Sequence, residues 1–291
     1  MIAFATNQTM PFVREMWKIC FGDSDEYMEL YFREKYRNEN TLVYFDDNQA
    51  VASLQMLPYI FTFHQTEIPI AYFSGLCTLP EARKKGFMAA LIRKAFEVLR
   101  QRQIPLAVLV PQEKWLLGFY DKFGFAQTFD AGTKEILSLK QLWEKYPDDL
   151  PAAYREFDNY FRMQDMTVQK TFEDFRAIMD EARLFDFPPK TNLTGMSRII
   201  DAEKLLTVFA RRYPEKTFSF SLSDAEIPKN RANFSFRNGL VESDHNNQTT
   251  EHSLDVRQLS QLLLGYHTSQ TEEPFRSLFP EKAPQINFML E

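Results

Sequence analysis

One basic turn in the N-terminal half of the chain has the composition of a phosphate-binding site. A strand-like segment ends at Pro80, the cations Arg83, Lys84 and Lys85 follow, and a helical pattern begins at Gly86. The first N–H groups of a helix lack intrahelical partners, and the helix dipole adds positive charge there. Glycine would let the backbone approach a ligand closely. The turn therefore indicates a pyrophosphate site, although an ordinary solvated basic turn explains this segment alone equally well.

The turn and a second segment further along the chain together resemble the sequence pattern of GNAT acetyltransferases. The first part, from Leu76 to Met88, reads LCTLPEARKKGFM, and the second, from Gly118 to Phe125, reads GFYDKFGF. Both parts occur in the family's order and at about the family's separation. Met88 is a departure, because glycine or alanine is usual at that position.

The resemblance implies a mixed α/β fold that uses acetyl-CoA as a cosubstrate. The backbone of Leu76 and Thr78 would bind the pantetheine and the acetyl carbonyl, and the turn would hold the pyrophosphate. The full set of residues implied to bind the cofactor is Leu76, Cys77, Thr78, Arg83, Lys84, Lys85, Gly86, Phe87 and Met88.

Acetylation of an amine requires a neutral amine, stabilisation of the developing oxyanion and a proton for the departing thiolate. Tyr120 stands where the family has its general acid; a merely packed phenol is the alternative. Glu113, just past the central strand, could receive the amine proton, and Asp25 and Glu26 could attract a cationic substrate. All three carboxylates could equally be ordinary surface charges, those of Asp25 and Glu26 complementing a helix dipole.

The two cysteines, Cys20 and Cys77, are far apart in the sequence and form no CxxC pair. We expect both to be reduced core residues. Cys77 has no neighbouring histidine that would lower the pKa of its thiol. We therefore expect its thiol to be inert. We also expect its side chain to point away from the cofactor face of the strand.

Hydrophobic periodicity predicts the elements that position these residues. Residues 11–36 predict two helices separated by a break at 22–25, with Asp23 or Ser24 as the N-cap of the second helix. The order of these helices and of the elements that follow predicts a mixed α/β layer, with a ligand cleft near the carboxyl ends of its central strands. The elements that follow are strands at 41–47, 50–63 and 66–79, a helix at 86–102, a buried strand at 104–111, a helix at 115–123 and a strand from 124.

The rest of the chain changes character. We predict an acetyltransferase domain at residues 1–135, a helical connecting segment at 136–195 and a small α+β domain at 196–291. Short cues in the last domain resemble the sterol-carrier-protein-like domain of Eis-like ("enhanced intracellular survival") acetyltransferases. The connecting segment is much shorter than the second GNAT-like domain of that subgroup. The cues are RIIDA from Arg198, DAEIPKN from Asp224, LDV from Leu254 and LG from Leu264.

The end of the chain carries a further expectation. In Eis-like enzymes the terminal carboxylate reaches into the acetyltransferase cleft, and the resemblance implies this role for Glu291. Ile286, Phe288 and Leu290 alternate with other side chains, which predicts a strand with one anchored face. Glu291 would then place negative charge beside the incoming ammonium and help to accept its proton. A free, disordered tail is the alternative.

Composition excludes several other classes of function. The formal charge is −6, from 34 basic and 40 acidic residues, and such a balance gives no broad positive surface for nucleic acid. The sequence shows no signal peptide and no membrane span, so we expect a cytoplasmic protein. The four histidines and two cysteines lack metal-ligand spacing, and no metal is expected.

Together these features predict an acetyl-CoA-dependent N-acetyltransferase. It would move an acetyl group to a primary amine of a small molecule or peptide by direct attack, with Tyr120 as the general acid. A non-catalytic CoA- or lipid-binding sensor on the same scaffold is the main alternative, and a pure interaction protein is a third. The sequence leaves open the acceptor amine and any homo-oligomeric assembly, because specificity depends on loop shape rather than on a motif.

Overall fold

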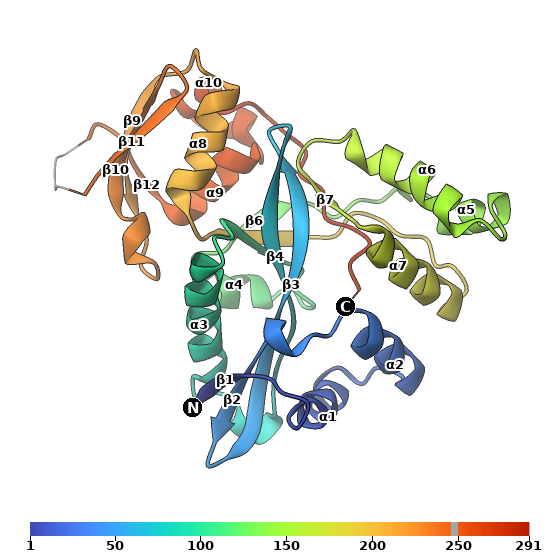
Figure 1. Ribbon diagram of the computed structural model, residues 1–291. Coiled ribbons are helices and arrows are strands. Elements are labelled where there is room, and N and C mark those ends of the chain that lie inside the picture. Colours follow the sequence, from blue (N-terminus) through green and yellow to red (C-terminus); the bar gives the residue numbers. More distant parts are fainter. Residues whose placement is uncertain (246–249, 291) are drawn as a thin grey trace.

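A large mixed sheet forms the centre of the computed structural model, which describes residues 1–245 and 250–290 (Figure 1). Its strand order is β1-β2-β3-β4-β5-β8-β6, and β7 pairs with β3. Among these pairs β4 and β5 are parallel and the others are antiparallel. The strands are β1 (Ile2–Phe4), β2 (Thr41–Asp46), β3 (Gln49–Phe63), β4 (Thr66–Thr78), β5 (Leu106–Leu109), β6 (Ala126–Phe129), β7 (Thr167–Gln169) and β8 (Gly195–Ile199).

Helices cover both faces of this sheet. In β5, Leu106 and Val108 belong to the hydrophobic cluster that includes the helices α1 (Met10–Phe21) and α2 (Asp25–Glu34). Ala107 and Leu109, which point to the opposite face, belong to the cluster that includes α3 (Phe87–Gln101). This double burial explains why β5 is apolar at every position, as the sequence predicted.

The break between the first two helices is also as predicted. α1 ends at Gly22, whose φ of +72° is the left-handed conformation common after a helix. Ser24 is the N-cap of α2, and its side chain accepts a hydrogen bond from the backbone N–H of Tyr27. Asp23 therefore lies in the loop with its side chain available for another role.

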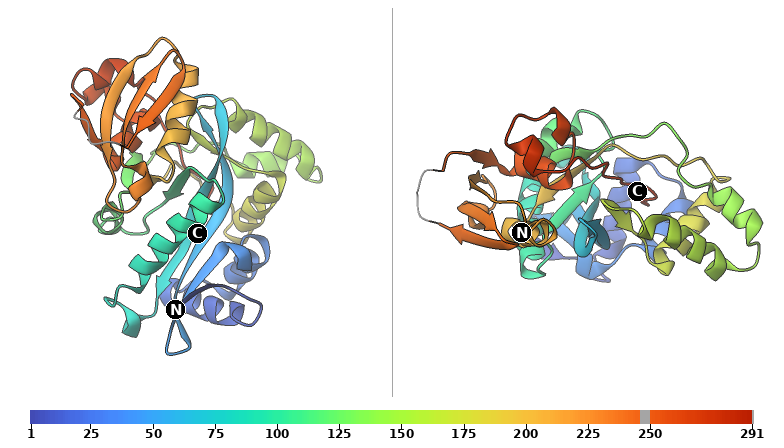
Figure 2. Two further views of the ribbon diagram at one scale, coloured as in Figure 1. Left: turned by 60° about the vertical axis from the view of Figure 1, so that its left-hand side comes forward. Right: turned by 90° about the horizontal axis from the view of Figure 1, so that it is seen from above.

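The connecting segment contains a strand as well as helices. Helices α5 (Leu139–Lys145), α6 (Leu150–Arg162) and α7 (Phe172–Leu184) are accompanied by β7, which pairs with Ile60–Thr62 of β3. α7 is joined to the region of α2 by an ion pair between Lys35 and Asp174 and by another between Arg176 and Glu34 at 2.8 Å. The connecting segment therefore adds a strand to the first sheet and packs its helices beside that sheet (Figure 2).

The strand β8 belongs to the first sheet although it follows the connecting segment in the sequence. It lies between β5 and β6 and is antiparallel to both. A domain boundary at residue 196 therefore falls inside a strand of the first sheet. Short apolar strands look alike in sequence whichever sheet they join, which is why the pattern of β8 did not reveal its partners.

The C-terminal region forms a second sheet with the strand order β11-β10-β9-β12. Figure 2 shows this layer at one end of the long hairpin of β3 and β4. Its elements are α8 (Ala202–Arg212), β9 (Phe218–Ser223), β10 (Ala232–Arg237), β11 (Leu240–Asp244), β12 (Ser253–Asp255), α9 (Val256–Leu264) and α10 (Phe275–Leu278).

A buried ion pair joins the two sheets. The guanidinium of Arg198, in β8, donates hydrogen bonds to both carboxylate oxygens of Asp224 at 2.6 and 2.8 Å, and both side chains are almost fully buried. It also donates to the carbonyl oxygens of Phe123 and Ile199, each at 2.7 Å. Asn230 donates a further bond to Asp224 at 2.9 Å. The network therefore couples the folding of the C-terminal region to that of the first sheet.

Candidate active site

The candidate site lies where β4 and β5 separate. The two strands pair between Ile70–Tyr72 and Leu106–Val108, and within the described residues the ladder does not continue towards Thr78. On the other side of β4 the register with β3 shifts beside Gly75, which has a φ of +58°. A Cβ atom at Gly75 would lie 2.6 Å from Cζ3 of Trp17. Glycine is therefore required both by the backbone conformation and by the close contact with Trp17.

Two cavities occupy this separation and meet at Tyr120. The smaller, of about 150 Å³, is lined by Trp17, Phe21, Asp23, Tyr72, Phe73, Ser74, Gly75, Leu76, Val110, Gln112, Leu116 and Tyr120. The larger, of about 580 Å³, extends from Tyr120 to the basic turn and the start of α3. Both cavities include Tyr120, Leu76 and Gln112 in their walls. Groups bound in the two cavities would therefore come into contact beside Tyr120.

The basic turn forms one wall of the larger cavity. Gly86 is the N-cap of α3 with a φ of +83°, and a Cβ there would meet no other atom within 4 Å. The glycine is therefore required by its backbone conformation, and the space beside it is open towards the cavity. The expected cofactor residues that line this cavity are Leu76, Cys77, Thr78, Arg83, Lys84, Gly86, Phe87 and Met88.

Lys85 is the one expected cofactor residue that does not line the larger cavity. Its Nζ atom lies 4.0 Å from Asp46 and 5.9 Å from the ring centroid of Phe87. Arg83, in contrast, folds back on β4, and its Nε atom donates a hydrogen bond to the carbonyl oxygen of Thr78 at 3.2 Å. The positive charge at the cavity therefore comes from Arg83 and Lys84.

Tyr120 is held in place by its helix and by aromatic neighbours. It belongs to α4 (Leu116–Asp121) and is 7% exposed. Its ring contacts those of Phe119 and Phe125 with centroid separations of 5.3 and 5.8 Å. This packing fixes the ring at the junction of the two cavities.

The acidic residue in the smaller cavity is Asp23, for which the sequence suggested only a role as a helix cap. Its Oδ2 atom accepts a hydrogen bond from Nε1 of Trp17 at 2.7 Å. Trp17, Phe21 and Tyr72 surround it with aromatic rings. The sequence left the N-cap open between Asp23 and Ser24, so no local signal marked the Asp23 carboxylate. In the structure Ser24 is the cap, and Asp23 lies directly before it.

The other acidic candidates lie elsewhere. Asp25 is exposed and pairs with Lys18 at 2.7 Å, which holds the pKa of the Asp25 carboxyl below its ordinary value. Neither Asp25 nor Glu26 lines either cavity. Glu113 does line the larger cavity, and its carboxylate accepts a hydrogen bond from the exposed indole of Trp115 at 2.6 Å.

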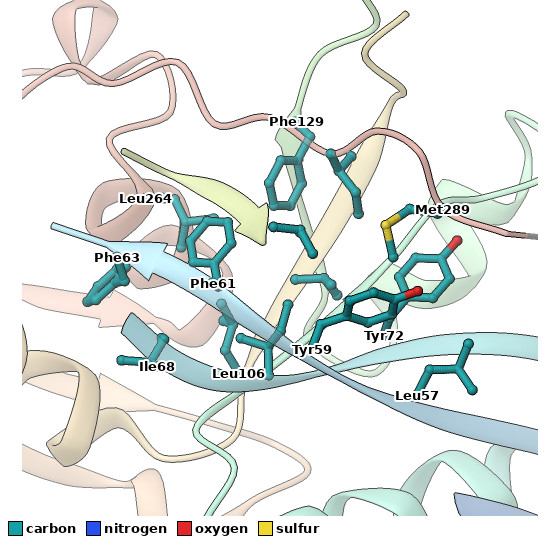
Figure 3. Close-up of a cluster of buried hydrophobic side chains, with 14 of the residues drawn as sticks. Leu57, Tyr59, Phe61, Phe63, Ile68, Tyr72, Leu106, Phe129, Leu264 and Met289 are labelled. Atoms are coloured by element: carbon teal, nitrogen blue, oxygen red, sulfur yellow. The ribbon is translucent and has the colours of Figure 1, made fainter. Parts of the chain in front are cut away.

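The tail is buried against the connecting segment and the first sheet. The carbonyl oxygen of Ile286 accepts a hydrogen bond from Leu193, and the ring of Phe288 packs on those of Phe157 and Phe161 at 5.5 and 5.8 Å. Figure 3 shows Met289 next to Tyr72, which lines the smaller cavity.

The predicted strand at the chain end is wrong. Every residue from Ile286 to Leu290 is buried, and Phe288 has a φ of +49°, which breaks an extended conformation. The residues of the tail are therefore in contact with neighbours on several sides. The alternating sequence pattern had predicted that only one face of the tail would be buried. The Glu291 carboxylates, to which the resemblance gave a catalytic role, lie outside the described residues.

Cys77 is 3% exposed, as expected for a core residue. It is also one of the residues that line the larger cavity, together with Cys20. The register shift between β3 and β4 lies close to it, beside Gly75.

Within residues 1–245 and 250–290, no helix is long and apolar enough to cross a membrane. In the same ranges, no group of three or more histidine, cysteine, aspartate or glutamate side chains has the arrangement of a metal site.

Comparison with known proteins identifies both parts of the chain. A family model described as an acetyltransferase (GNAT) domain matches residues 2–128, and one described as a sterol carrier protein domain matches residues 203–277. No curated protein matches the chain.

Solved structures share the fold over nearly the whole chain. A GCN5-related N-acetyltransferase from Anabaena variabilis has a TM-score of 0.72 at 15% identity, and one from Kribbella flavida has 0.66 at 14%. Eis1 from Mycobacterium abscessus has a TM-score of 0.64 at 14% identity. In all three comparisons the match covers 98% of each chain. Residues 2–128 therefore match a GNAT acetyltransferase domain and residues 203–277 a sterol carrier protein domain, and the fold of the chain is similar to that of Eis1.

Proposed function

We propose that the protein transfers the acetyl group of acetyl-CoA to a primary amine of a small molecule or peptide. The observation that carries this proposal is the meeting of two cavities beside Tyr120. One cavity is basic and follows the end of β4, and the other is aromatic and contains a carboxylate. A donor and an acceptor bound in them would bring a thioester and an amine together.

The larger cavity is assigned to acetyl-CoA. The pantetheine would follow the part of β4 between Leu76 and Thr78, whose backbone β5 does not cover. The pyrophosphate would lie at the start of α3, close to Arg83, Lys84 and the backbone N–H groups of the first turn. The extended pantetheine and the negatively charged pyrophosphate of acetyl-CoA match a cavity that runs from Tyr120 to the basic turn.

The smaller cavity is assigned to the acceptor amine. The Asp23 carboxylate would attract an ammonium group, and the faces of Trp17 and Tyr72 would favour a cation. The ammonium loses a proton, and its nitrogen then attacks the acetyl carbonyl carbon to form the new C–N bond. When the C–S bond breaks, the Tyr120 hydroxyl gives a proton to the thiolate of CoA. For the proton from the amine we retain Glu291 as the proposed acceptor, with Glu113 as the alternative.

Replacement of Gly86 by valine is expected to weaken acetyl-CoA binding. Valine is disfavoured at a φ of +83°, and its side chain would occupy the open space beside the basic turn. Isothermal calorimetry with acetyl-CoA measures the change, and Gly22→Val, at another left-handed glycine that lines neither cavity, is the matched control. Unchanged affinity in a folded Gly86→Val protein would show that the donor site is elsewhere.

Replacement of Asp23 by asparagine is expected to raise KM for a cationic amine by about 10- to 100-fold, the usual range for a hydrogen bond to a charged group. Asparagine can still accept the bond from Trp17, so the loop keeps its anchor while the charge is removed. Steady-state kinetics with a verified substrate measure the effect. Asp25→Asn is the control and should leave KM unchanged; the reverse result would place the substrate at Asp25.

A further inference from the structure

Two cysteines from distant parts of the chain meet at the wall of the larger cavity. Cys20 is in the last turn of α1, and Cys77 is the penultimate residue of β4. Both residues line the cavity, and the Sγ atom of Cys20 lies 3.5 Å from the carbonyl oxygen of Thr78, the residue that follows Cys77. Cys20 is half-buried, whereas Cys77 is 3% exposed. A small reagent in the cavity can therefore reach Cys20 first.

The surroundings make the two thiols chemically different. The Sγ atom of Cys20 lies 3.5 Å from the carbonyl oxygen of Thr78, which also accepts a bond from Arg83. Interaction with Cys77 and with the nearby guanidinium of Arg83 lowers the pKa of Cys20 to about 6. The interaction with Cys20 and complete burial raise the pKa of the Cys77 thiol well above its ordinary value. Near neutral pH, Cys20 is then a thiolate and Cys77 a thiol.

We propose that Cys20 and Cys77 are an oxidative modification site, at which hydrogen peroxide converts the two thiols into an intrachain disulfide that blocks the larger cavity. Formation of the disulfide does not depend on the proposed function. Its effect on acetyl-CoA rests on the proposed function, which places the cofactor in that cavity.

The reaction takes place in two steps. The Cys20 thiolate attacks one peroxide oxygen, the O–O bond breaks, and Cys20 becomes a sulfenic acid while hydroxide leaves and takes up a proton. The Cys77 sulfur then attacks the Cys20 sulfur, the S–S bond forms, and the hydroxyl group leaves with the Cys77 proton as water. Peroxide is reduced to two molecules of water, and the two thiols are oxidised to one disulfide.

The disulfide would change the wall on which the cofactor is proposed to bind. Cys77 now contacts the hydroxyl of Ser53 at 3.1 Å, and Cys20 contacts the carbonyl oxygen of Thr78. Both contacts have to be given up when the sulfur atoms bond to each other. The bond would also tie the end of α1 to β4 between Leu76 and Thr78, whose backbone is proposed to bind the pantetheine.

The test treats the reduced full-length protein with hydrogen peroxide, and then maps disulfides by peptide mass spectrometry and measures acetyl-CoA binding by calorimetry. We expect a peptide bridged between Cys20 and Cys77, loss of acetyl-CoA binding, and recovery of both the thiols and the binding with dithiothreitol. Prior saturation with acetyl-CoA should slow the reaction. Failure to form the bridge would overturn the proposal, as would a bridge that leaves affinity unchanged.

Two variants distinguish the effect of cysteine oxidation on affinity from that of oxidation elsewhere. Met88, which lines the same cavity, is one such alternative target. Each variant is compared with itself before and after peroxide. Cys20→Ser should keep its acetyl-CoA affinity, and Cys77→Ser should accumulate a sulfenic acid that dimedone traps. If Cys20→Ser loses affinity as the unmodified chain does, another residue is responsible and the proposal fails. If the reduced protein does not bind acetyl-CoA, the assigned function fails, while the bridged peptide still decides whether the pair is redox-active.

Discussion

Replacing Tyr120 by phenylalanine is expected to lower turnover by about 10²–10⁴-fold, the usual contribution of a positioned general acid. The substitution removes only the hydroxyl, so the ring contacts with Phe119 and Phe125 remain. Affinity for acetyl-CoA should change little, because the proton is needed only when the C–S bond breaks. Steady-state kinetics combined with calorimetry measure the two quantities separately.

Tyr160→Phe is the matched control for this experiment. Tyr160 is 41% exposed on α6 and lines neither cavity, so the loss of its hydroxyl should leave kcat and KM unchanged. Equal turnover in the Tyr120→Phe and Tyr160→Phe variants would show that water or another group protonates the thiolate.

Replacing Arg198 by methionine is expected to lower the free energy of unfolding by about 3–5 kcal/mol. Methionine has a similar length, but the change leaves the Asp224 carboxylate buried without its cation, and the carbonyl oxygens of Phe123 and Ile199 also lose a donor. Urea titration followed by circular dichroism measures the difference.

Arg93→Met is the control, because the ion pair of Arg93 with Glu226 at 2.7 Å is exposed on the arginine side. Exposed pairs typically contribute about 0–1 kcal/mol. In the double variant Arg198→Met/Asp224→Leu the unpaired charge is removed, so part of the stability should return. Similar losses in Arg198→Met and Arg93→Met would contradict the role given to the buried pair.

The sequence was most informative where one local signal determines the structure. The long apolar patterns of β3 and β4, the buried strand β5 and the amphipathic helix α3 were predicted close to their observed bounds. Burial on one or both faces leaves a clear periodicity in such elements. The α+β character of the C-terminal region was also predicted, and its strands β9 and β10 alternate strictly between buried and less buried positions.

Features that depend on distant parts of the chain could not be predicted in this way. The position of β8 between β5 and β6 depends on pairing rather than on composition. The irregular path of the tail depends on neighbours such as Phe157 and Phe161, and its alternating pattern was therefore misleading. Cys20 and Cys77 line the same cavity only because α1 packs beside β4.

Sequence motifs and tertiary geometry contributed different parts of the candidate site. The motifs led to the basic turn and to Tyr120, because both have a characteristic local pattern. Asp23 has no such pattern, and its importance comes from Trp17 and Tyr72, which lie beside it in the smaller cavity. Local sequence therefore indicated the proposed donor side of the candidate site, whereas the proposed acceptor side required the fold.

The most direct test of the central claim is the rate of CoA release from acetyl-CoA in the presence and absence of candidate amines, with mass spectrometry of the product. Aminoglycosides, polyamines and peptides are suitable first acceptors. We predict amine-dependent CoA release and a product that carries the acetyl group on nitrogen, with both greatly reduced in Tyr120→Phe. Tight acetyl-CoA binding without transfer to any of these amines would contradict the account and would favour a non-catalytic CoA sensor instead.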